Sequence, residues 1–69
     1  MGYFNYHGIV KKLILDGKLI GYKFVEKYKA ISPCLLLFFA DTVHPVMPIR
    51  EYRFLEYLSI LPSDKEIFD

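Results

Sequence analysis

The chain of 69 residues lacks tryptophan and contains one cysteine and two histidines. Because Cys34 has no second cysteine to pair with, a disulfide within the chain is excluded. Two imidazoles and one thiol are also a poor supply of metal ligands, and no pair of them has a spacing such as C-x₂-C or H-x₃-H. We therefore expect no disulfide, no metal and no cofactor.

Long apolar runs are missing as well. The longest uncharged apolar run, residues 34–40, has seven residues, whereas a membrane-spanning helix needs about 20. Residues 1–5 also lack the basic and apolar regions of a signal peptide. A free cysteine without an export signal is typical of a reducing compartment, so we expect a cytoplasmic protein with no membrane span.

The composition predicts an ordered domain that gains from association. Hydrophobic residues make up 54% of the chain and charged residues 25%, which excludes disorder. A chain of this length buries only about 60% of its unfolded surface, so its core is marginal. Small domains of this kind often depend on disulfides, a metal or a partner subunit, and only the partner subunit is left here.

Charge is distributed unevenly although the net charge is only +1. Residues 1–33 carry six lysines and two acids, for a net charge of +4, and residues 34–69 carry three basic and six acidic residues, for a net charge of −3. This asymmetry could attract an anionic partner, or pair the two halves with each other or across a dimer axis. Solvation of the outward faces explains it most simply.

A buried strand is predicted over residues 34–40. Its core is the apolar run Cys34-Leu35-Leu36-Leu37-Phe38-Phe39, which follows Ser32-Pro33 and precedes Asp41-Thr42. A short run of bulky residues between turn-forming residues is typical of a strand covered on both faces.

The segment before this strand supports two interpretations. Ile9, Val10, Leu13 and Ile14 fall on one helical stripe, with Asn5 as N-cap and Gly17 at the C′ position. The dipeptide Asp16-Gly17 between apolar arms is also a hairpin signal. We favour the helix, because the adjacent Lys11 and Lys12 would occupy both faces of a strand.

Alternation with a period of two begins at Leu19 and predicts a half-buried strand with lysines on its outer face. Glu26 breaks the alternation, so the strand has a bulge there or stops. Pro45 and Pro48 limit a third strand to a short edge segment, with Pro48 near its end and well placed to begin a helix. That helix would bury Phe54, Tyr57, Leu58 and Leu61 and end at Pro62.

The sequence therefore predicts one α+β domain over residues 1–69. Its elements follow the order helix, three strands, helix, with a three-stranded antiparallel sheet and a loose tail over residues 63–69. The lysine-rich and proline-bearing strands would form the edges, which protects the apolar central strand from aggregation.

An interaction function follows from the predicted surplus of apolar surface. A central strand that is apolar on both faces needs more cover than two short helices provide, and an exposed apolar face marks an interaction site. We expect a non-enzymatic protein-interaction module that forms a homodimer or binds another protein through an apolar sheet or helix face. The candidate contact residues are Arg50, Tyr52, Arg53 and Tyr57, because Arg and aromatic residues are enriched at interface centres.

Arg50 is expected at the start of the second helix, where the helix dipole disfavours a positive charge. An ion pair with Glu26, Asp41 or Glu51 would offset that position. Alternatively, Arg50 and Arg53 would together bind an anionic group of a partner.

Nucleic-acid binding is the alternative function. Basic and aromatic side chains alternate over residues 18–29, as in single-strand binders. The candidates are Lys18, Tyr22, Lys23, Lys27, Tyr28 and Lys29. Since the aromatics and most lysines fall on opposite faces of the strand, a solvated edge explains the lysines better.

Catalysis is the least favoured function. Cys34 and His44 are the available nucleophile and base, but Cys34 begins a buried strand and His44 lies in a turn before Pro45. So small a fold rarely encloses a substrate pocket. We therefore expect no enzyme and no small-molecule substrate.

Overall fold

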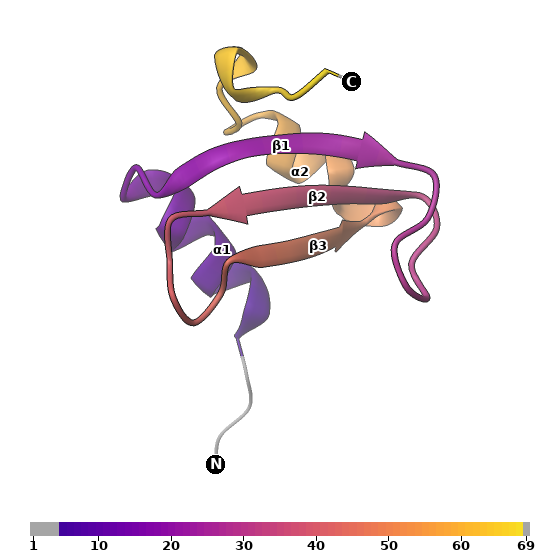
Figure 1. Cartoon of the computed structure of the whole chain (residues 1–69), viewed down its shortest axis with the longest axis horizontal. Coiled ribbons are helices and arrows are strands. Elements are labelled where there is room, and N and C mark those ends of the chain that lie inside the picture. The colour runs from indigo at the N-terminus through magenta and orange to yellow at the C-terminus, as the bar shows by residue number, and fades with distance from the viewer. Residues whose placement is uncertain (1–4, 69) are drawn as a thin grey trace.

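The computed structural model describes residues 5–68 and has the predicted α+β architecture. Three strands, β1 (Leu19–Val25), β2 (Cys34–Phe39) and β3 (Val46–Arg50), form an antiparallel sheet in the order β1-β2-β3. Helix α1 (Tyr6–Leu15) precedes the sheet, and the 3-10 turn η1 (Glu51–Arg53), helix α2 (Phe54–Leu58) and a second 3-10 turn, η2 (Ser63–Lys65), follow it. Both α-helices lie behind the same face of the sheet in the view of Figure 1.

Of the two structures considered for the segment before β1, a helix or the first arm of an Asp16-Gly17 hairpin, the chain adopts the helix, α1. The Asn5 side chain accepts a hydrogen bond from the Gly8 N–H at 3.1 Å, which caps the helix. At the other end Gly17 has φ +77°, and the Lys18 N–H donates to the Leu13 carbonyl at 3.0 Å. This left-handed glycine termination ends the helix where a hairpin turn would otherwise begin.

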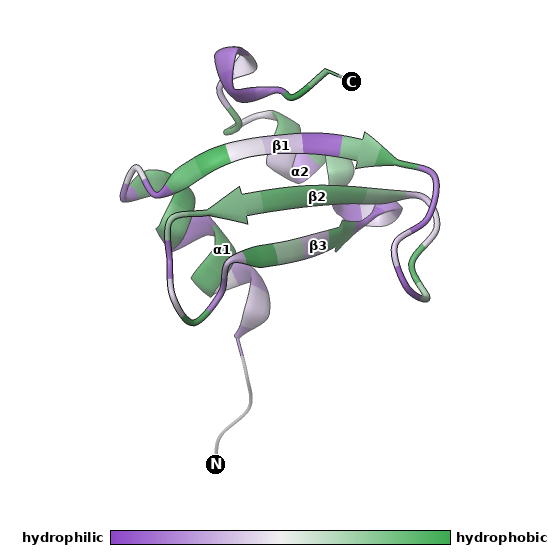
Figure 2. Cartoon of the chain, viewed as in Figure 1, coloured by the Kyte–Doolittle hydropathy of each residue, from purple (hydrophilic) through white to green (hydrophobic). Residues whose placement is uncertain are grey.

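The core lies between the helices and the covered face of the sheet. Across the strands, Tyr22 aligns with Leu37 and then Met47, and the next row on this face ends in Ile49. Val10 of α1 packs against these rows. Apolar residues dominate the sheet in Figure 2, because the core takes one side of every strand.

One boundary follows a stated alternative and two features differ from the prediction. Strand β1 ends at Val25, so of the two alternatives the strand stops at Glu26, and a bulge lies at Ile20. Pro48 lies in the middle of β3 and does not begin a helix. The C-terminal helix is shorter than expected, with α-helical structure only over Phe54–Leu58.

The position of Pro48 has a simple cause. The Phe39 N–H donates to the Pro45 carbonyl at 2.9 Å, and hydrogen-bonded pairs recur at every second residue of an antiparallel ladder. This alternation turns the backbone groups of Val46, Pro48 and Arg50 away from β2. A proline costs no ladder hydrogen bond at such a position on an edge strand.

Residues 63–68, which we call the tail, lie along the outer edge of β1. The Ile67 N–H donates to the Tyr22 carbonyl at 2.8 Å, and Glu66 forms a parallel bridge with Tyr22. The looseness predicted for residues 63–69 concerns mobility and stays a prediction.

Candidate interaction groove

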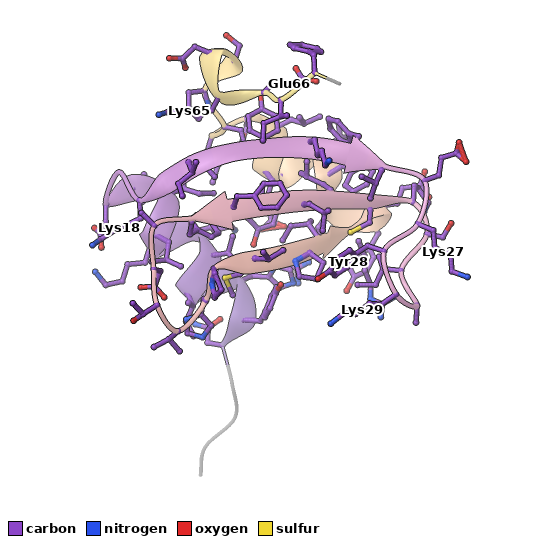
Figure 3. The ribbon with its side chains drawn as sticks, in the orientation of Figure 1. Lys18, Lys27, Tyr28, Lys29, Lys65 and Glu66 are labelled. Carbon is purple, nitrogen blue, oxygen red and sulfur yellow. The ribbon has the colours of Figure 1, made fainter. Side chains whose placement is uncertain are left out.

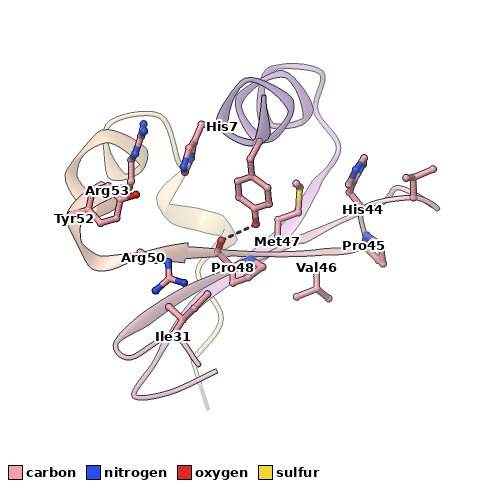
Figure 4. A pocket seen from close by; sticks show the side chains of 12 residues that line it. His7, Ile31, His44, Pro45, Val46, Met47, Pro48, Arg50, Tyr52 and Arg53 are labelled. Carbon is pink, nitrogen blue, oxygen red and sulfur yellow. Dashed lines mark hydrogen bonds between the residues drawn. The ribbon is translucent and has the colours of Figure 1, made fainter. Parts of the chain in front are cut away.

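A groove with a volume of about 400 Å³ follows the free edge of β3. The start of α1, the β2–β3 turn, β3 itself and η1 all contribute residues to its walls (Figure 4). Its apolar floor is formed by Val46 and Pro48, whereas Met47, which also lines it, is only 2% exposed and belongs to the core. We call it the β3-edge groove.

Unused backbone groups face this groove. Val46 and Arg50 direct their N–H groups outward, and neither N–H has a backbone acceptor within residues 5–68. Pro48 has no N–H, and its carbonyl accepts a hydrogen bond from the Tyr6 hydroxyl at 2.8 Å (dashed line in Figure 4). An extended segment could therefore bond to the two ends of the β3 edge but not to its middle.

Tyr6 fixes the wall of the groove that belongs to α1. Burial, followed by the influence of Cys34 and Tyr28, raises the pKa of the Tyr6 hydroxyl to about 12. The hydroxyl therefore stays protonated and remains a donor to Pro48 at neutral pH. This contact joins residues 42 positions apart and holds the first turn of α1 against β3.

Cationic side chains line one end of the groove. Arg50 is exposed and forms no ion pair within the described residues. Arg53 donates to Glu56 at 2.9 Å, and Glu56 also pairs with Lys11 of α1. Because Arg53 is paired with Glu56, Arg50 is the cation left for a partner. In Figure 4 the side chains of Arg50 and Arg53 point away from each other.

His7 adds a polar group beside Arg53. Its Nδ1 lies 2.7 Å from the Tyr57 hydroxyl, which has no other hydrogen-bond partner in the described chain. The buried hydroxyl is satisfied as a donor only if Nδ1 accepts, which leaves the proton of neutral His7 on Nε2. Burial, reinforced by Arg53 and Lys11, lowers the pKa of His7, and burial raises the pKa of Tyr57 to about 12.

The β2–β3 turn closes the other end of the groove. The Asp41 carboxylate accepts hydrogen bonds from the N–H groups of Val43 and His44, at 3.2 and 2.7 Å. These bonds, led by the one from His44, lower the pKa of Asp41. The His44 ring lies 3.5 Å from the same carboxylate, so Asp41 fixes both the backbone and the imidazole of the turn.

Three of the four predicted contact residues, Arg50, Tyr52 and Arg53, line this groove. Tyr57 does not: it is fully buried, because it lies on the side of α2 that packs against the sheet. Arg50 is the last residue of β3 and the N-cap of η1, so it lies where the helical segment begins, as predicted, but it pairs with none of the three expected acids. Tyr52 is 77% exposed, and its ring centroid lies 5.7 Å from the Arg53 guanidinium.

The predicted nucleic-acid residues are dispersed. Lys18 lies at one end of the sheet, and Lys27, Tyr28 and Lys29 lie at the other end (Figure 3). Tyr22 is only 4% exposed on the covered face. Among the six candidates one cation–aromatic pair is found in the described chain, with the Lys29 Nζ 5.5 Å from the Tyr28 ring centroid.

Lys23 lies on the opposite face of β1 from Tyr22, as the alternation predicted. Nucleic-acid binding therefore stays a prediction, but the structure does not assemble its six candidates into one surface.

The residues considered for thiol or metal chemistry are also separated. Cys34 is fully buried at the start of β2, and this burial raises the pKa of its thiol. His7 and His44 line opposite ends of the β3-edge groove. Within residues 5–68 no three His, Cys, Asp or Glu side chains cluster as metal ligands.

Sequence reasoning missed Tyr6 and His7 as groove residues. Both begin a helix whose apolar stripe was the only pattern considered, and their contacts, with Pro48 and Tyr57, are distant in sequence. Two aromatic rings in the first turn, ahead of that stripe, are the one signal that could have drawn attention to them.

None of the helices described for residues 5–68 combines the length and hydropathy needed to cross a membrane. Comparisons of the chain with protein-family models, with curated proteins and with solved structures found no match.

Proposed function

We propose that this chain is a small, non-enzymatic protein-interaction module that associates with itself. One observation carries the proposal: the β3-edge groove combines a free strand edge, an apolar floor and the guanidinium of Arg50, which has no ion-pair partner among the described residues. Each of these features is used in interfaces between proteins. We place the protein in the cytoplasm, on the grounds of its lone buried Cys34.

The sheet face without helices supports the proposal less strongly than the sequence suggested. Five of the six β2 residues are buried within the monomer, and only Phe38 is partly exposed. The central strand therefore offers a partner little surface of its own. Neighbouring residues extend the apolar area, since Val46 beside Phe38 is 37% exposed and Ile20 is 59% exposed.

Exposed apolar side chains elsewhere also favour association. Tyr52 and Leu55, on η1 and α2, are 77% and 84% exposed, and Leu15 at the end of α1 is 79% exposed. Single exposed apolar residues are ordinary, but a domain with so small a core gains much from covering them. Of these three residues Tyr52 lines the β3-edge groove, where apolar surface, charge and free backbone coincide.

Light scattering or sedimentation across a wide concentration series tests the proposal. We expect the mass to rise above the monomer value of 8.1 kDa as concentration increases. Added salt should shift the transition to higher concentration if Arg50 takes part, because salt screens exposed charges. A mass that stays at the monomer value at every concentration would contradict self-association.

A further inference from the structure

The tail presents a surface complementary to the β3-edge groove. It is already extended at Glu66, where φ is −69° and ψ is 133°. Asp64 and Glu66 form no ion pair with any described residue. The Phe68 side chain is 80% exposed, so the tail offers carboxylates and an aromatic ring on one short segment.

The tail cannot occupy the groove of its own chain while it is docked. It pairs with β1, whereas the groove lies on β3, and β2 separates these two strands. Figure 1 shows the tail and β3 at opposite edges of the sheet. Figure 3 likewise places Lys65 and Glu66 beyond β1, at the far edge from β3. The groove of a second copy is free of this constraint.

Gly21 adapts β1 to the tail. A Cβ at position 21 would lie 2.9 Å from the Ile67 Cδ1 and 3.1 Å from the Lys65 carbonyl oxygen. Only glycine allows so close an approach, which holds the tail extended on β1 with its other side toward solvent. In this position the backbone of the tail is already extended at Glu66, so binding in the same conformation requires little rearrangement.

We infer that the β3-edge groove of one copy binds the tail of a second copy, with an Asp64 or Glu66 carboxylate on Arg50 and Phe68 on the apolar floor. This inference rests on the proposed self-association and names its two surfaces. Opposite charge draws the tail to the groove, and the outward N–H group of Arg50 or of Val46 can bond to the backbone of residues 66–68, which follow the 3-10 turn η2. Lys65, between the two acids, stays in solvent.

Such a contact joins two different surfaces and is heterologous. Each copy that donates a tail keeps its own groove open, and each copy that accepts one keeps its own tail. Assemblies of this type either grow as chains or close as rings. A face-to-face dimer would instead use the same surface twice.

Two charge-reversal variants test this arrangement. Arg50→Glu reverses the charge of the groove and leaves the tail intact, whereas Asp64→Lys combined with Glu66→Lys reverses the charge of the tail and leaves the groove intact. We expect each variant alone to self-associate roughly tenfold more weakly than the wild-type chain, because like charges then meet across the contact.

A mixture of the two variants should recover association. The intact groove of the tail variant meets the intact tail of the Arg50→Glu variant, and the reversed groove meets the reversed tail. Opposite charges face each other in both contacts, so we expect the mixture to associate although neither variant does so strongly alone. Sedimentation of each variant and of the equimolar mixture, at one total concentration, measures this recovery.

Matched controls separate this contact from general charge effects. Lys18→Glu and Glu26→Lys change exposed residues that do not line the groove or belong to the tail. Alone or mixed, they should associate like the wild-type chain. Thermal unfolding followed by circular dichroism checks that every variant is folded.

Three outcomes would overturn the inference. If both charge-reversal variants associate as strongly as the wild-type chain, another surface is used and the proposed self-association still stands. If each variant is weakened but their mixture does not recover, the groove and the tail do not contact each other. If the wild-type chain stays monomeric at every concentration, the inference fails together with the proposed function.

Discussion

The Tyr57 hydroxyl lies 2.7 Å from the Nδ1 of His7, a residue 50 positions earlier in the chain. The contact joins α2 to the first turn of α1, where His7 lines the β3-edge groove. It also fixes the proton of neutral His7 on Nε2, because the tyrosine hydroxyl is the donor. The shape of the groove therefore depends on a polar contact between two helices.

Stability should fall as the pH decreases below about 6.5, the ordinary pKa of histidine. Since the folded chain lowers the pKa of His7, the unfolded chain takes up the proton first as the pH falls. Urea unfolding at about pH 7.5 and about pH 5.5, on either side of that value, measures the effect, and His7→Gln should reduce the difference. If the free energy of unfolding depends on pH equally in His7→Gln and in the wild-type chain, titratable groups other than His7 cause the effect.

Tyr57→Phe should lower the free energy of unfolding by about 1 kcal/mol, the usual net value of one hydrogen bond. The ring stays buried, so the variant loses only the donor to His7. Urea unfolding measures the loss. Tyr52→Phe is the matched control, because Tyr52 is 77% exposed, and it should leave stability unchanged.

Gly21→Ala should release the tail from β1. The added methyl group would lie 3.1 Å from the Lys65 carbonyl oxygen, so the tail backbone must move. We expect faster hydrogen exchange at the Ile67 amide, whose bond to Tyr22 holds the tail in place. The Leu37 amide in the core is the reference and should exchange at the same rate in both proteins. If the exchange rate at Ile67 is also unchanged, the tail tolerates the methyl group.

Pro48→Val should increase association through the β3 edge. Valine restores an N–H that points outward, and it favours extended backbone, so the edge gains a donor at its centre. Light scattering against concentration measures the change. Association no stronger than that of the wild-type chain would show that Tyr6, bonded to the Pro48 carbonyl, already blocks the edge.

Local patterns were sufficient for the elements and their order. The stripe that includes Val10 and Ile14 predicted α1, and the run from Cys34 to Phe39 predicted β2. The pairs Lys12–Asp16 and Arg53–Glu56, at 2.8 and 2.9 Å, follow from helical spacing alone. Such patterns work because each depends on residues only a few positions apart.

The candidate site was predicted in part. Arg50, Tyr52 and Arg53 were named from residue type, and all three line the groove. Tyr57 is buried, as the helical stripe predicted, so its choice as a contact residue, which was made from residue type, was wrong.

By itself, the sequence determined an α+β chain with a buried central strand, because the periods of helix and strand are local properties. Only the tertiary structure decided that both helices cover one face, that Tyr6 reaches Pro48 and that the tail lies along β1. The contacts of Tyr6 and of the tail join residues that are far apart in the chain, 42 positions in the case of Tyr6 and Pro48, and no local period encodes them.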